Sequence, residues 1–190
     1  ILGAFFLLRI PKTKFYLQTI KPSLEHSDAD YRIGRFIWSA RLTNFFATII
    51  GAVFLCTITA YTAKELKLSK SEIGVLLGCC YATIIVIFFI LGQFKGWICS
   101  YSIIMFALFP ITLGILGIYL FSSMPILIVC FLFIGLGFSI SYTLSIYYSL
   151  AWSKNRTSNS GIHEALFGIA ILVGTVGMGQ TVRYFKDPAI

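Results

Sequence analysis

Long apolar runs separated by shorter polar stretches dominate this sequence. Their approximate limits are residues 36–63, 73–91, 98–121, 126–150 and 157–182. The fifth run opens with polar residues, and we expect a polar loop over residues 151–160. An α-helix of about 20 apolar residues crosses the roughly 30 Å hydrocarbon core of a bilayer, and every run is close to that length or longer. None of them shows the strict alternation of apolar and polar residues that marks a membrane β-strand. The pattern predicts an all-α fold, a polytopic bundle of five transmembrane helices.

Residues 1–35 depart from this pattern and predict a boundary. Residues 1–8 are apolar but too few to cross a bilayer, so we expect them to be the end of a preceding transmembrane helix in a longer protein. Residues 9–35 are polar, rich in Lys and Arg, and contain two prolines, which argues against one continuous helix. We expect a cytoplasmic linker over this stretch, followed by a C-terminal bundle of five spans over residues 36–190.

The low content of charged residues supports a membrane protein. Only 12% of the residues are charged and 58% are hydrophobic, whereas a soluble domain has about 25% charged residues. The formal net charge is +8, and the basic residues lie mainly in the connections between apolar runs. This distribution indicates membrane topology, and we expect no nucleic-acid partner.

Five alternating spans sort the connections into two sets, one on each side of the bilayer. The set that contains the linker carries 10 Lys and Arg residues, and the other set carries 5. The positive-inside rule then places the linker and its set in the cytoplasm. We expect a multi-pass integral protein of the plasma (inner) membrane, surrounded by the lipid bilayer.

The residues that enzymes and metal sites need are scarce. The five cysteines lie in or at the edge of apolar runs without metal-ligand spacing, and we expect them to be buried as small apolar residues. The two histidines are His26 and His163, and Glu164 is the one acid inside a long apolar run. A membrane enzyme would need paired carboxylates, a His-rich metal motif, or a nucleophile with its base. We therefore expect no enzyme activity, no metal and no cofactor.

The neighbours His163 and Glu164 are the first candidate site residues. A carboxylate at membrane depth normally faces a bundle interior or a water-filled cavity, which makes Glu164 a candidate for binding a substrate or a proton. Two structural roles compete: a hydrogen bond to a neighbouring helix, or a carboxylate stabilised by the helix dipole, since we place Glu164 three residues into its helix. His163 titrates near neutrality. Adjacent helix positions lie about 100° apart, so the two side chains need not face the same cavity.

Polar positions on two other spans extend the candidate site. Arg41, Asn44 and Thr48 follow one another at i, i+3 and i+7, so they share one helix face that is suited to line a cavity. The alternative for Arg41 is that it snorkels to the interface. In SISYTLSIYYSL, residues 139–150, hydroxyl side chains repeat at helical spacing, and Tyr142 and Ser145 are the favoured cavity residues. Tyr147 and Tyr148 fit a cavity or an interfacial belt equally well.

Small residues and one proline predict how the spans pack. Gly74, Gly78 and Ala82 lie four apart and predict a face for close helix–helix contact. Small residues also repeat along residues 157–182. Pro110 is expected to kink the third span. The very short turn at residues 122–125 predicts an antiparallel pair of spans.

Several of these features together resemble a known family. The long basic connection, the loop GQFKGW at residues 92–97 and the Gly-rich later span resemble the C-terminal half of a major facilitator superfamily transporter. SISYTLSIYYSL, a short polar loop and SGIHEALFGIAILVGTVGMG look like the tenth and eleventh helices of bacterial members. On this resemblance residues 1–8 end the sixth helix and residues 9–35 are the central linker. The five spans are helices seven to eleven, and the twelfth helix and the N-terminal six-helix half are missing.

The resemblance implies alternating access, with a small-molecule substrate bound near the midplane between two six-helix halves. We therefore expect a secondary active transporter of a small solute, with coupling to a proton left open. The alternative is a non-transporting membrane receptor or assembly subunit with the same fold. The candidate substrate- or proton-binding residues are Arg41, Asn44, Tyr142, Ser145, His163 and Glu164.

Overall fold

The computed structural model is all-helical in the part that it describes, which is residues 26–64, 66–94, 97, 101–151 and 156–186. In chain order the helices are α3 (His26–Lys64), α4 (Lys70–Gln93), α5 (Tyr101–Phe106), α6 (Leu108–Leu120), α7 (Met124–Ala151) and α8 (Arg156–Lys186). Five stretches of these residues are long and apolar enough to cross a membrane, and α5 and α6 together form one of them. The predicted all-α polytopic bundle is confirmed. The expected helix end at residues 1–8 and the linker before residue 26 lie outside the described residues.

Two helices begin earlier than we expected from the sequence. α3 starts at His26 and takes up the last part of the expected linker. α8 starts at Arg156, so residues 156–160, which we expected in a loop, form its first turn. The apolar stretch of α3 begins only at Gly34, whereas that of α8 begins at Thr157, one residue after the helix start. Hydropathy marks the part of a helix that suits hydrocarbon, and it carries no signal for a polar end that continues the same backbone hydrogen bonding.

α4 begins at a capping box that fixes its first turn. The Ser69 hydroxyl accepts a hydrogen bond from the backbone N–H of Glu72, and the Glu72 carboxylate accepts one from the backbone N–H of Ser69 at 2.7 Å. Each group satisfies an amide that has no partner within the helix. The chain enters this cap through Lys67, whose φ of 52° is left-handed. A defined turn therefore separates α3 from α4.

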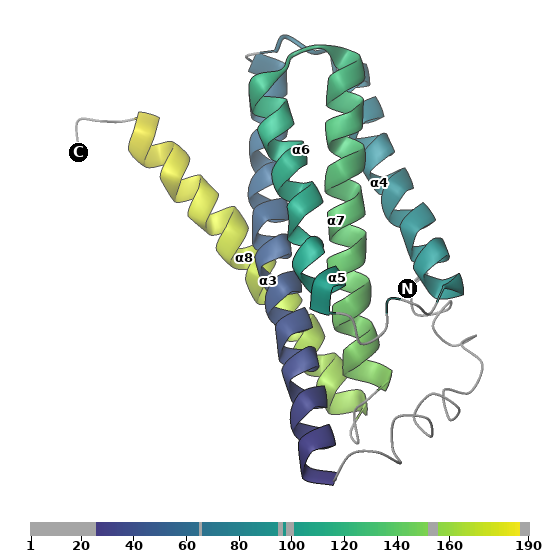
Figure 1. Ribbon diagram of the computed structural model, residues 1–190. Coiled ribbons are helices and arrows are strands. Elements are labelled where there is room, and N and C mark those ends of the chain that lie inside the picture. Colours follow the sequence, from purple (N-terminus) through teal and green to yellow (C-terminus); the bar gives the residue numbers. More distant parts are fainter. Residues whose placement is uncertain (1–25, 65, 95–96, 98–100, 152–155, 187–190) are drawn as a thin grey trace.

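α7 is the central helix and contacts α3, α4, α6 and α8. Successive spans run in opposite directions (Figure 1). Residues 121–123 reverse the chain between α6 and α7, which confirms the predicted antiparallel pair. α8 packs mainly on α3 and also touches α7. Toward its C-terminal end α8 leans away from the other helices in Figure 1.

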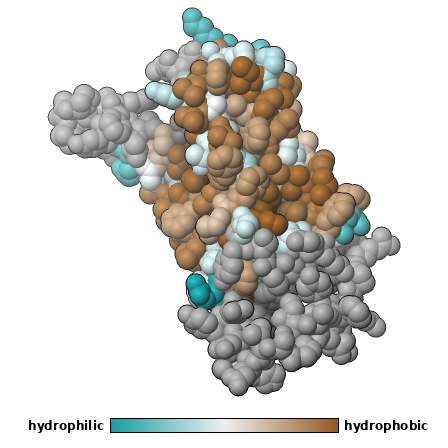
Figure 2. All heavy atoms as spheres, in the orientation of Figure 1, coloured by the Kyte–Doolittle hydropathy of each residue, from teal (hydrophilic) through white to brown (hydrophobic). Residues whose placement is uncertain are grey.

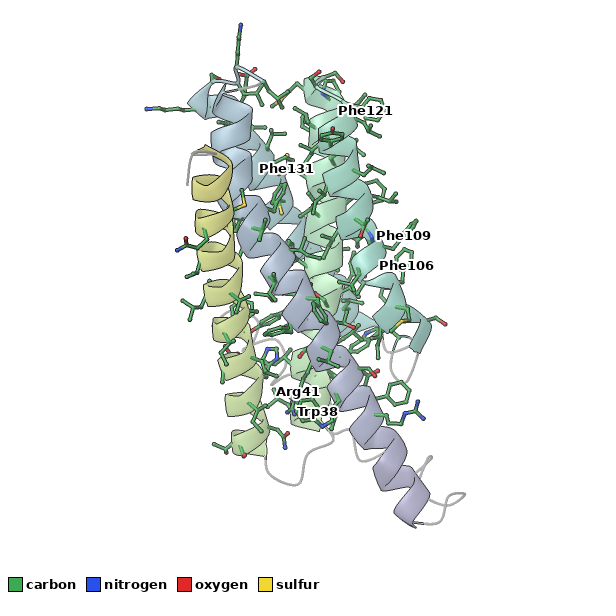
Figure 3. All side chains as sticks on the ribbon, turned by 90° about the vertical axis from the view of Figure 1, so that its left-hand side faces the viewer. Trp38, Arg41, Phe106, Phe109, Phe121 and Phe131 are labelled. Carbon is green, nitrogen blue, oxygen red and sulfur yellow. The ribbon has the colours of Figure 1, made fainter. Side chains whose placement is uncertain are left out.

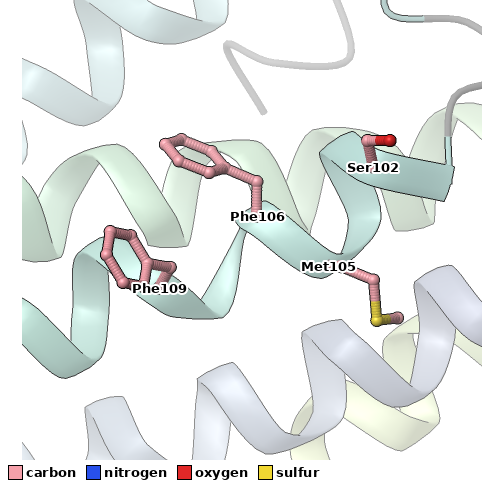
Figure 4. Close-up of a pocket in the computed structure, with 4 residues that line it drawn as sticks. All are labelled: Ser102, Met105, Phe106 and Phe109. Atoms are coloured by element: carbon pink, nitrogen blue, oxygen red, sulfur yellow. The ribbon is translucent and has the colours of Figure 1, made fainter.

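The third span is interrupted where Pro110 predicts a kink. Proline donates no hydrogen bond to the carbonyl four residues earlier, and its ring clashes with that carbonyl. Here that carbonyl belongs to Phe106, and the helix breaks at Ala107 between α5 and α6. Near this break, a shallow apolar hollow on the surface of α5 and α6 is lined by Ser102, Met105, Phe106 and Phe109 (Figure 4).

Glycines on α7 allow its close contacts with α4 and with the third span. A Cβ atom at Gly135 would lie 2.5 Å from the backbone oxygen of Cys80 on α4. At Gly137 it would lie 2.6 Å from the backbone oxygen of Ala107. Real Cβ atoms do not approach that closely, so these helices pack at their present distance only because both positions lack a side chain.

The packing face predicted on α4 is wrong within the described part of the chain. Gly74 and Gly78 face open space, since a Cβ atom at either position would have no described atom within 4 Å, and Ala82 is exposed. The close contact of α4 instead uses the backbone around Cys80 against a glycine of α7. The spacing of small residues on α4 therefore did not predict its contact with α7, which depends on a glycine of α7.

Apolar side chains fill the bundle and also cover its outside. One cluster joins α4, α6 and α7 through side chains such as Leu76, Ile118 and Phe131. A second cluster gathers around Trp97, whose ring contacts Tyr147 edge-on at a centroid distance of 4.9 Å. Figure 2 shows mostly hydrophobic residues over the described outer face, as expected for helices in contact with lipid.

Tyr147 and Tyr148 belong to this second cluster and are only 5% and 0% exposed. Neither therefore forms an interfacial belt, and their rings pack as core. Of the cysteines, Cys80 and Cys130 are buried as expected and Cys79 is half-buried. The side chains of Cys56 and Cys99 lie outside the described residues.

Candidate functional site

The six candidate residues lie on three helices that pack together. Arg41 and Asn44 are on α3, Tyr142 and Ser145 on α7, and His163 and Glu164 on α8. α7 and α8 both contact α3, and they also contact each other. Arg41, Asn44, Ser145 and His163 are at most 3% exposed, and Tyr142 is half-buried, whereas Glu164 is 54% exposed.

Arg41 joins all three helices through hydrogen bonds. Its Nε donates to Ser149 Oγ of α7 at 3.3 Å, and its Nη2 donates to both the backbone and the side-chain oxygen of Asn159 of α8. The guanidinium also lies 5.3 Å from the centre of the Trp38 ring, and Figure 3 shows the two side chains together. Arg41 is only 3% exposed. It is therefore buried between the helices, and its partners Ser149 and Asn159 lie near the ends of the apolar stretches of α7 and α8.

Asn44 and Thr48 lie on the same buried face of α3 as Arg41. The two are 3% and 6% exposed, which confirms the shared face that their spacing predicts. The Thr48 hydroxyl donates to the backbone oxygen of Asn44 at 2.7 Å, so it is bonded within its own helix. Asn44 and Arg41 are therefore the residues of this face best suited to bind a solute.

His163 is buried against α7. It is 1% exposed, and its Nδ1 lies 2.8 Å from Ser145 Oγ. The Tyr142 ring meets the imidazole nearly edge-on, with the centroids 5.2 Å apart. The other ring nitrogen, Nε2, is buried and has no hydrogen-bond partner in the described structure. A buried polar atom without a partner costs free energy, and a water molecule, an ion or a solute can supply the missing hydrogen bond.

Glu164 follows His163 in sequence but lies on a different side of α8. Its side chain is 54% exposed, and its Oε1 lies 3.8 Å from His163 Nε2. Because α8 begins at Arg156, Glu164 is in the third turn and not three residues into the helix as we expected. The helix dipole acts mainly within the first turn, so it does not account for this carboxylate.

The small residues of α8 lie on two sides of the helix, the buried side that carries His163 and the exposed side that carries Glu164. Ala170 and Gly174 are buried, and a Cβ at Gly174 would lie 2.8 Å from the backbone oxygen of Ile49 on α3. Gly161 and Gly168 lie three before and four after Glu164, so they share its face. Both are exposed, with no described atom within 4 Å. Glu164 therefore occupies an exposed face lined by glycines.

The two residues that bind Arg41, and one buried threonine of α7, are not among the six candidates predicted from the sequence. Asn159 was expected in a loop, although its spacing of four from His163 places both on one helix face. Ser149 belongs to the hydroxyl stripe of α7, but nothing in the stripe indicates that it meets an arginine. Thr143 is 9% exposed, and its Oγ1 is the second buried side-chain atom without a hydrogen-bond partner in the described residues.

Comparison with known proteins adds no family to this description. The chain matches no protein-family model, no curated protein and no solved structure. Among the described residues, no three His, Cys, Asp or Glu side chains lie close enough to hold a metal ion. What the fold and site define is a membrane protein with a polar cluster buried between three of its helices.

We expect Ser145→Ala to destabilise the protein by about 1–3 kcal/mol, because it removes the hydrogen-bond partner of a buried His163 nitrogen. The matched control is Ser141→Ala on the same helix, whose hydroxyl donates to the backbone oxygen of Phe138 in its own helix. Thermal unfolding of the two purified variants measures the difference. Equal losses at both positions would show that the serine–histidine contact contributes nothing specific.

Proposed function

We propose that this chain forms part of a secondary active transporter that moves a small solute by alternating access. The observation that carries the proposal is the exposed carboxylate of Glu164 on a helix suited to cross a membrane. A charged group in contact with lipid is costly, and such residues normally face a cavity that holds water or substrate. The side of α8 that carries Glu164 is therefore its cavity side.

The neighbouring residues support a transport path along this side. Gly161 and Gly168 leave space beside the carboxylate. Behind them Arg41, Ser145 and His163 form a polar cluster within apolar spans. A purely structural bundle gains little from such a cluster, because each polar group must be removed from water and then paired. Polar groups on facing helices are instead the usual material of a solute site in a membrane bundle.

The contact between His163 and Glu164 is where we place proton uptake. Two titratable groups lie 3.8 Å apart, one buried and one exposed. The Glu164 carboxylate would take up a proton from the exposed side and pass it to the buried Nε2 of His163. The Tyr142 ring of α7 meets the imidazole, and Arg41 of α3 binds Asn159 of the same helix α8. Protonation would change the charge at a point where α8 meets both helices.

The resemblance to the major facilitator superfamily supports the same proposal. It supplies the second six-helix half against which the exposed face of α8 would close. It also agrees with the excess of basic residues in the set of connections that we expect in the cytoplasm of a plasma (inner) membrane protein.

The experiment is solute uptake by the full-length protein reconstituted into vesicles under an imposed pH gradient. The solutes to be tested are sugars, amino acids, carboxylates and inorganic phosphate. Protein-dependent accumulation of one of them that collapses with the gradient is the expected result. Specific solute binding without flux under any gradient would contradict the proposal and favour a non-transporting receptor.

A further inference from the structure

Arg41 carries a buried positive charge without a carboxylate partner among the described residues. The described acceptors of its hydrogen bonds are all neutral: the hydroxyl of Ser149 and two oxygens of Asn159. Glu164 contacts His163, and it forms no ion pair with Arg41. A guanidinium that is 3% exposed within an apolar span needs a counter-charge, because neutral oxygens only partly replace the water that it has lost.

The groups around Arg41 favour an anion. Asn159 lies in the first turn of α8, a helix of 31 residues, so the positive end of the helix dipole is directed toward the same place. The Nη1 nitrogen of Arg41 makes no hydrogen bond to a described residue. Asn44, one turn further along α3, is buried beside it and adds an amide. Donors and positive potential therefore come from two helices.

The present partners of Arg41 imitate the ligand that such a site would take. Asn159 presents two oxygens to one guanidinium nitrogen, and Ser149 presents a third oxygen to Nε. Carboxylate and phosphate groups offer oxygens to a guanidinium in the same way, with the addition of negative charge. An anion could replace Asn159 without leaving a donor of Arg41 unpaired.

From this geometry we infer that the solute is an oxyanion, with a carboxylate or phosphate group that binds Arg41 in place of Asn159. The inference rests on the proposed transport function, whose substrate class it supplies. It assigns Asn159 as the internal ligand that holds Arg41 when no solute is bound. Binding would also release the link from α3 to α8, because Asn159 provides the hydrogen bonds between Arg41 and α8.

The test is ligand-induced thermal stabilisation of the full-length protein, titrated with succinate and, separately, with inorganic phosphate at constant ionic strength. Succinamide is the neutral control for succinate. We expect saturable stabilisation by one of the two anions, which identifies the group that the site prefers, and none by succinamide. Equal responses to succinate, phosphate and added chloride would overturn the inference.

The sharpest variant is Asn159→Asp, which supplies a permanent carboxylate to Arg41. It is expected to fold at least as stably as the original protein and to weaken anion binding about tenfold or more, because the two carboxylates compete. Arg41→Lys keeps the charge but loses the forked geometry, and it should also weaken binding. Arg35→Gln removes a charge from an exposed position of the same helix and should leave binding unchanged.

Two outcomes separate this inference from the proposed function. If Asn159→Asp binds the anion as tightly as the original protein does, or if only cations or neutral solutes are carried, the anion site is wrong and transport still stands. If an anion binds in an Arg41-dependent manner but is never carried across the vesicle membrane, transport is wrong and the anion site still stands.

Discussion

Replacing Glu164 with glutamine is expected to abolish the dependence of solute accumulation on the pH gradient while leaving the protein folded. Glutamine has nearly the same shape as glutamate but takes up no proton. The side chain is 54% exposed, so the change disturbs little packing. If the proton and the solute are coupled through this carboxylate, the gradient-driven increase in solute accumulation falls by the coupling factor. That factor is typically about 5- to 150-fold. Uptake into vesicles with and without a pH gradient measures it.

The matched control is Glu72→Gln in the capping box of α4. It makes the same chemical change at the start of another helix, and glutamine retains the capping role. We expect uptake by this variant to match the original protein. If Glu164→Gln retains full gradient-dependent uptake, proton coupling at this position is wrong.

Replacing Gly135 with leucine is expected to cost about 3 kcal/mol or more of stability, the upper range for overpacking a tight contact. A side chain there meets the backbone oxygen of Cys80 at 2.5 Å, and a backbone atom cannot move aside as the end of a side chain can. α7 and α4 would have to separate, which disrupts the apolar cluster around Leu76 and Phe131. Thermal unfolding in detergent provides the measurement.

Gly78→Leu on α4 is the control for this prediction. It introduces the same side chain into the same pair of helices, but at a position with no described atom within 4 Å. We expect a stability close to that of the original protein. A loss as large as that of Gly135→Leu would show that another segment or chain packs against this face of α4.

The spans, and the helices that carry the site, are predictable from the sequence because apolar length is a direct physical requirement of the bilayer. The shared face of Arg41, Asn44 and Thr48 is also predictable, since helical periodicity alone determines it. So is the separation of His163 from Glu164, because adjacent positions point in directions about 100° apart. These features depend on one helix at a time.

Features that depend on two helices escape prediction from one sequence. The hydrogen bonds of Arg41 to Ser149 and Asn159 join residues more than 100 positions apart, and no pattern within either segment indicates the pairing. The prediction of the packing face on α4 was wrong for the same reason. The space for the close contact is provided by Gly135 of α7, which the sequence of α4 does not reveal. The start of α8 was missed because we interpreted its first, polar residues as a loop, and this error misplaced both Asn159 and Glu164 relative to the start of the helix.

The central claim is that the Glu164 side of α8 lines a water-filled path that opens to each side of the membrane in turn. Its most direct test is Gly168→Cys in a full-length protein whose native cysteines are replaced, treated with a membrane-impermeant thiol reagent from one side or the other. Phe109→Cys, at an exposed apolar position of α6 that we expect to face lipid, is the control. We predict that Gly168→Cys reacts, and that bound solute changes the side from which it reacts, while Phe109→Cys stays inert. A cysteine at position 168 as unreactive as the one at position 109 would contradict the claim.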